Sequence, residues 1–141
     1  MNASAGDGGA GAGASNLAAA KGVALGLALG VVGACGWALM THFSPVLVGF
    51  VAWGVGWMAG KGVVRGNGGR VGTGWALTAV AITALCFALS KLLTILLRVS
   101  EGSVILDWWL AYQREYDVLD VLWFGLAVWP AWGIGLRGRD A

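Results

Sequence analysis

The chain has 141 residues, of which 58% are hydrophobic and only 11% are charged, and its net charge is +2. A soluble globular domain carries about 25% charged residues, so this chain has too little charge to cover a water-soluble surface, and lipid is its expected solvent. The small net charge also excludes a general basic field for nucleic acid, and the length allows a single domain.

The first 16 residues form a low-complexity segment of Gly, Ala and Ser with one charge, Asp7. Such a segment buries too little apolar area to offset the entropy lost when it becomes ordered. We therefore expect residues 1–16 to be a disordered, Gly/Ala-rich cytoplasmic tail. Residues 17–141 are expected to form one membrane domain.

Two apolar runs follow, at residues 22–41 and 45–60. The first is close to the ~20 residues that a transmembrane helix needs, and the second lies at the short end of the range. Both runs carry glycines at four-residue spacing, a pattern that lets two helix backbones approach closely. These glycines are Gly22, Gly26 and Gly30 in the first run and Gly56 and Gly60 in the second. We expect the two stripes to pack against each other in a hairpin; the alternative is docking to a second copy or another protein.

Cys35 offers a second interpretation of the first run, because Val32 to Cys35 loosely matches a lipoprotein cleavage site. However, the apolar sequence continues beyond Cys35 to Met40, and the segment before the run is long for a signal peptide. We therefore expect Cys35 to remain within the first helix.

A basic, glycine-rich segment runs from Lys61 to Gly72, and it contains Lys61, Arg65 and Arg70 but no acid. It matches neither the P-loop nor the dinucleotide-binding fingerprint, because residues that those motifs require are replaced. We expect a cytoplasmic turn whose cations meet anionic lipid headgroups, where each cation contributes roughly 1 kcal/mol.

Two further apolar runs occupy residues 74–97 and 118–136, and each carries one charge at membrane depth. These charges are Lys91, in the last third of the third run, and Asp120, about one turn into the fourth. Charges at such depth are costly and often functional. Lys91 can pair with Asp120, or with Glu101 or Asp107, and we expect structural anchoring ahead of an ion pathway.

Residues 102–117, between the third and fourth runs, mix charges with aromatic side chains at spacings of three and four. This spacing predicts an amphipathic helix that lies in the membrane interface. Its anchoring face consists of Trp108, Trp109, Tyr112 and Tyr116.

The basic residues set the orientation of the spans, because cytoplasmic segments carry an excess of Lys and Arg. The Lys61–Gly72 segment is thereby placed in the cytoplasm, and four spans then place both termini there; Lys21, Arg137 and Arg139 agree. The predicted fold is an all-α membrane protein, a four-transmembrane-helix bundle with an amphipathic interfacial helix before the last span. Its expected location is the cell membrane, multi-pass, with cytoplasmic N- and C-termini.

The segment from Gly54 to Gly72, followed by an apolar helix, resembles a group of uncharacterised bacterial four-helix membrane proteins. Asp117 to Gly135 looks like the last span of that group, and the resemblance covers roughly the last two-thirds of the chain. It implies the same architecture, with no known activity, cofactor or catalytic residue.

No arrangement of side chains in the sequence indicates catalysis. The two cysteines lie in distant apolar runs and there is a single histidine, so a zinc site has no ligand set. We expect no enzyme activity, no cofactor and no metal. The expected partners are the lipid bilayer and either a second copy or another membrane protein, with no nucleic acid.

The predicted function is that of an accessory or scaffold component of a membrane assembly, acting through helix packing. The alternative is a small oligomeric transporter or channel, with Lys91 and Asp120 near its outer entrance. A membrane enzyme is a third and weaker hypothesis, because no residue can be named for its active site.

Overall fold

Four helices make up the part of the chain that the computed structural model describes, which is residues 8–43, 48–100 and 118–138. They are α1 (Gly8–Phe43), α2 (Val48–Gly66), α3 (Thr73–Ser100) and α5 (Val118–Arg137). No strand occurs in these ranges, so the all-α prediction is confirmed for the described residues.

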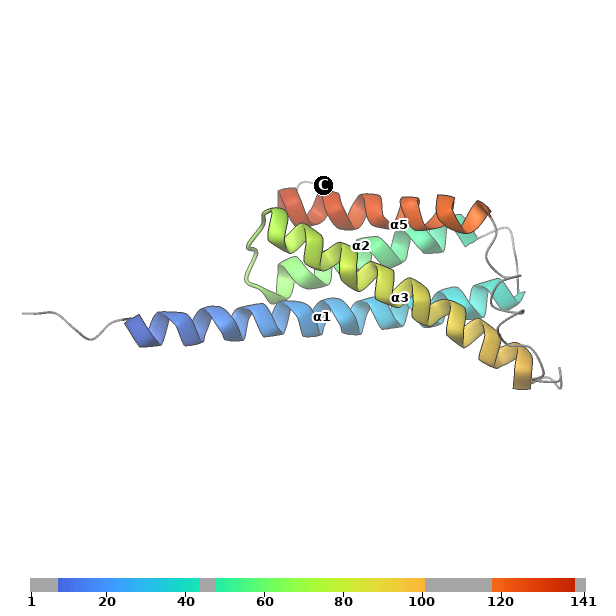
Figure 1. Cartoon of the computed structure of the whole chain (residues 1–141), viewed down its shortest axis with the longest axis horizontal. Helices are drawn as coiled ribbons and strands as arrows, with labels where there is room; N and C mark the ends of the chain where they lie inside the picture. The colour runs from blue at the N-terminus through green and yellow to red at the C-terminus, as the bar shows by residue number, and fades with distance from the viewer. Residues whose placement is uncertain (1–7, 44–47, 101–117, 139–141) are drawn as a thin grey trace, which may run out of the picture.

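The helices run up and down along one axis and form a bundle (Figure 1). α2 and α3 each pack against the three other helices, whereas α1 and α5 lie on opposite sides of them. The turn between α2 and α3 lies at the same end of the bundle as the last residues of α5. Each helix therefore runs in the opposite direction to the one before it, as in an up-and-down helix bundle.

Two of the helices are long and apolar enough to cross a membrane. Gly13–Met40 of α1 has 28 residues and Thr73–Leu96 of α3 has 24 residues, and an 18-residue stretch in each has a mean hydropathy of 2.0 and 2.1, respectively. Only 33% and 44% of their apolar stretches are buried within the bundle, whereas the core helix of a soluble protein is mostly buried. The length, composition and exposure of these helices point to a membrane location.

α1 begins earlier than the sequence predicts. The disordered tail is expected to include residues 1–16, but residues 8–16 continue α1 as helix, so this part of the prediction is wrong. Alanine has the highest helix propensity, and extending a helix that is already formed costs far less than starting one. Figure 1 shows this first part of α1 projecting beyond the other helices. Residues 1–7 lie outside the described residues.

α2 ends six residues beyond its predicted limit of residue 60 and continues to Gly66. Lys61 and Arg65 therefore lie on its last turns, and of the three predicted loop cations only Arg70 is in the turn. The helix ends where Gly68 and Gly69 adopt φ values of 79° and 84°, which other residues rarely take. The Gly69 N–H donates to the Val64 carbonyl oxygen at 2.8 Å and closes the helix end.

The remaining boundaries agree with the predicted runs within a few residues, and Cys35 lies exposed on α1, which continues to Phe43. The predicted interfacial helix at residues 102–117 lies outside the described residues. This also applies to its four aromatic anchors, Trp108, Trp109, Tyr112 and Tyr116.

Candidate functional site

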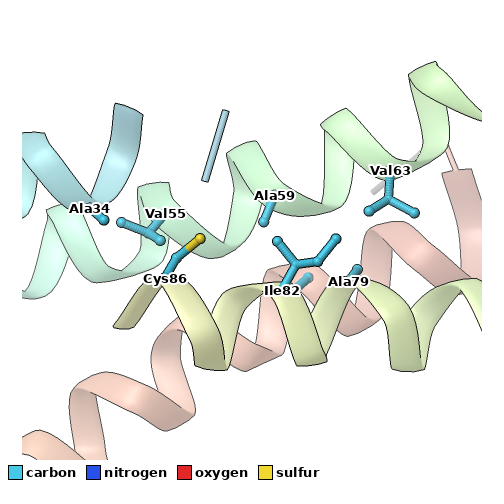
Figure 2. Close-up of a cluster of buried hydrophobic side chains, with 8 residues drawn as sticks. Ala34, Val55, Ala59, Val63, Ala79, Ile82 and Cys86 are labelled. Carbon is cyan, nitrogen blue, oxygen red and sulfur yellow. The ribbon is translucent and has the colours of Figure 1, made fainter. Parts of the chain in front are cut away.

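The centre of the bundle is built from small side chains. Ala34, Ala59, Ala79 and Ala131, one from each helix, are all fully buried. Figure 2 shows the larger members of this cluster beside the alanines, with Ile82 and Cys86 on α3 and Val55 and Val63 on α2. Small residues at helix contacts let the backbones approach and gain dispersion energy over long stretches.

α1 and α2 touch backbone to backbone through two pairs of glycines. A Cβ atom on Gly62 would lie 2.7 Å from the Cα of Gly26, and one on Gly66 would lie 2.7 Å from the Cα of Gly22. Both distances are too short for any side chain. Gly62 and Gly66 were not among the predicted packing residues, because the sequence assigns them to a loop; their four-residue spacing was the signal that could have identified them.

The predicted pairing of the two glycine stripes with each other is wrong. Gly56 and Gly60 face α5 instead of α1: a Cβ on Gly56 would overlap the carbonyl oxygen of Ala127. A Cβ on Gly60 would lie 3.3 Å from the Cα of Ala131. α2 therefore carries one glycine pair for each of two neighbouring helices. The pairs lie on different sides of α2 because Gly62 follows Gly60 by only two residues, whereas residues on one side recur every three or four.

The glycine stripe of α1 faces α2 at its beginning and α3 further along the helix. A Cβ on Gly26 would lie 2.6 Å from Cγ2 of Val63 and 3.1 Å from Cδ1 of Ile82. A Cβ on Gly30 would lie 2.5 Å from Sγ of Cys86. Gly26 and Gly30 thus face the junction of α2 and α3, and the nearest atom to each added Cβ belongs to a side chain.

α5 contacts α3 through a third close approach. A Cβ on Gly135 would lie 2.8 Å from the backbone nitrogen of Ala76. At the same place the Gly72 N–H donates to the Gly135 carbonyl oxygen at 3.0 Å. Ala127, Ala131 and Gly135 follow one another at four-residue spacing, so they form a row of small residues along the inner face of α5.

Lys91 and Asp120, the two charges at predicted membrane depth, form an ion pair between α3 and α5. The Lys91 Nζ lies 2.7 Å from both Oδ1 and Oδ2 of Asp120. The two side chains are only 12% and 10% exposed. Asp120 also lies in the first turn of α5, where the helix dipole favours a negative charge. The alternative partners, Glu101 and Asp107, lie outside the described residues.

The buried hydroxyl groups of α3 form hydrogen bonds with the backbone of their own helix. Thr83, Ser90 and Thr94 are buried on α3, and each hydroxyl donates to a carbonyl oxygen three or four residues earlier at 2.7–2.9 Å. Among the described side chains, no buried nitrogen or oxygen lacks a hydrogen-bond partner. The same part of the chain contains no group of three metal-ligating side chains.

The predicted headgroup cations occupy two different settings. The Lys61 Nζ lies 5.6 Å from the ring centroid of Trp57, a cation–π contact, while Arg65 and Arg70 are exposed. Asn67, which the sequence analysis did not single out, fixes the turn: its Oδ1 accepts from the Arg70 N–H at 2.8 Å. Its Nδ2 donates to the Arg70 carbonyl oxygen at 3.0 Å, and the side chain is buried.

Comparisons with protein families, curated proteins and solved structures find no match to this chain. The resemblance to bacterial four-helix membrane proteins therefore stays an expectation. The function has to be argued from the arrangement of the residues themselves.

Proposed function

We propose that this chain is a four-span integral membrane protein that serves as an accessory or scaffold component by packing its helices. The observation that carries this proposal is the distribution of side-chain sizes. Ala and Gly occupy many of the helix contacts in the interior, beside larger side chains such as Trp37, Ile82 and Phe87, while many Leu, Val and Trp side chains are exposed on the exterior. In water this arrangement would be costly, because large apolar side chains gain most from burial. In lipid it is favourable, because helix association depends on close packing.

Exposed apolar side chains occur on all four helices. Val32 on α1, Leu85 on α3 and Val121 on α5 are 61%, 59% and 72% exposed, and Trp53 on α2 is 46% exposed. Trp129 on α5 is 80% exposed. Monomeric soluble proteins rarely show apolar surface on this scale. The exposed faces of α2 and α5 support their assignment as the second and fourth spans.

Two properties of the interior favour a scaffold over a transporter. Lys91 and Asp120 neutralise each other. The buried hydroxyls of α3 are satisfied by their own helix, so they do not require water. A solute pathway needs polar groups at several depths that are open to the solute.

α5 also offers a surface to a partner. Val121, Leu122, Leu126 and Trp129 line a shallow apolar depression around Gly125. A Cβ on Gly125 would meet no atom within 4 Å. A glycine with large apolar neighbours forms a concave surface that suits a transmembrane helix of a second protein or a second copy.

Side-specific labelling tests the four-span arrangement. With Cys35 and Cys86 replaced by Ala, a cysteine introduced at Arg70 should react only from the cytoplasmic side of sealed cells or vesicles. A cysteine at Ser103 should react only from the opposite side, because α3 separates the two positions. Reaction of both cysteines from the same side would contradict the four-span arrangement.

Flux measurements test the scaffold role. Vesicles that contain the purified chain should leak protons and potassium no faster than empty vesicles, because the described interior offers no continuous polar path. The control is the same chain with Lys91→Met and Asp120→Leu combined, which removes both intramembrane charges. A flux that the wild type supports and the double variant loses would replace the scaffold with the transporter.

A further inference from the structure

Four cations from different parts of the sequence lie at the same end of the bundle. Arg65 precedes Gly66, where a Cβ would lie 2.5 Å from the Lys21 carbonyl oxygen, so Lys21 and Arg65 are neighbours along the axis. The Gly72–Gly135 backbone hydrogen bond brings the turn that holds Arg70 to the end of α5, where Arg137 lies. We call Lys21, Arg65, Arg70 and Arg137 the basic end.

The described chain places no carboxylate at the basic end. Within residues 8–43, 48–100 and 118–138 the one acidic residue is Asp120, and it pairs with Lys91 near the opposite end of α5. All four cations of the basic end are exposed. The four charges therefore create a positive potential at this end of the bundle that is available to an anion.

The turn at the basic end is held in one shape. Asn67 is 1% exposed and makes two hydrogen bonds to the backbone of Arg70. A Cβ on Gly22 would lie 3.0 Å from the Cβ of Asn67, so α1 supports this residue from the side. Arg70 is thereby presented by a fixed backbone, which reduces the entropy lost when it binds a ligand.

We propose that the basic end binds the phosphate groups of anionic phospholipids in the cytoplasmic leaflet. The neighbouring apolar groups favour a lipid over a free phosphate. Val71 is 46% exposed beside Arg70. The Trp57–Lys61 pair precedes Arg65 on α2, with Lys61 one turn before it. A tryptophan ring and a lysine stem suit the region where headgroups meet acyl chains. A free anion would gain nothing from these apolar groups.

This inference rests on the proposed membrane location and adds the class of lipid. The test is native mass spectrometry of the full chain, released from micelles that contain equal amounts of dioleoylphosphatidylglycerol and dioleoylphosphatidylcholine. The wild type should retain the anionic lipid preferentially. Arg65→Gln and Arg70→Gln should each reduce that preference about fivefold, equivalent to about 1 kcal/mol per cation near an anionic surface.

Two matched variants separate charge from structure. Arg98→Gln removes a cation from the far end of α3 and should leave the preference unchanged. Arg70→Lys keeps the charge and should retain most of the preference. If Arg70→Lys loses as much as Arg70→Gln while the helix content by circular dichroism stays constant, charge is not the cause and the proposal fails.

Three further outcomes would contradict either the inferred lipid binding or the proposed function. Equal retention of the two lipids by the wild type would overturn the inference, while leaving the membrane location intact because lipid is still bound. Displacement of the anionic lipid by millimolar inorganic phosphate would overturn it in favour of a site for soluble anions. A chain that retains neither lipid and does not sediment with vesicles would instead refute the proposed function itself.

Discussion

Gly56→Ala is expected to destabilise the bundle strongly, whereas Gly54→Ala, two residues away on the same helix, is not. A methyl group on Gly56 would overlap the carbonyl oxygen of Ala127 on α5, and backbone atoms cannot rotate away. Overpacking of this kind typically costs about 1–3 kcal/mol, and we expect the upper end because α2 and α5 must separate. Thermal unfolding in mild detergent, followed by circular dichroism, measures the effect.

Gly54 provides the control because a Cβ there would meet no atom within 4 Å. Alanine is the better helix former by about 1 kcal/mol, so Gly54→Ala should match or exceed the stability of the wild type. Gly26→Ala should fall between the two variants, because the nearest atom, Cγ2 of Val63, belongs to a side chain that can move. Equal melting temperatures for Gly56→Ala and Gly54→Ala would show that α2 and α5 do not pack as described.

Lys91→Met is expected to cost about 3–5 kcal/mol, because it removes the ammonium group that lies 2.7 Å from the Asp120 carboxylate in a nearly closed setting. Adding Asp120→Leu should restore most of that loss, since replacing both charges by apolar side chains of similar size is often neutral or stabilising. The measurement is a double-mutant cycle of unfolding free energies in detergent. The cycle isolates the interaction between the two side chains from their separate contributions.

The control for this cycle is Leu92→Met, a neighbouring apolar position that is 43% exposed and should change stability little. If the Lys91 and Asp120 effects simply add, with no recovery in the double variant, the ion pair contributes nothing to the stability of the bundle. The two charges would then need another explanation, and a role in transport would be the first to test.

The helical nature of the chain could be predicted from composition and run length, because a nearly uncharged apolar sequence has few ways to satisfy its backbone. The positions of α3 and α5 followed closely from their apolar runs. Four-residue spacing defines a face of a helix, and Gly22, Gly26 and Gly30 lie against α2 and α3 on such a face of α1.

The partner of each face could not be predicted in this way. Periodicity shows that Gly56 and Gly60 share a side of α2, but it contains no information on which helix covers that side. The end of α2 was also predicted wrongly: Lys61 and Arg65 suggested a loop, although charged residues are good helix formers. The contacts of Gly62 and Gly66 with α1 extend the helix instead, and those contacts depend on tertiary structure.

The first part of α1 determines how far from the bundle anything attached to it is held. Residues 8–20 precede Lys21, which lies level with the end of α2, and Figure 1 shows them continuing as a straight rod. At 1.5 Å per residue these 13 residues span about 20 Å. A fluorescent reporter fused to this end would therefore be held about that distance further along the α1 axis. Energy transfer to a dye at the basic end can measure this distance.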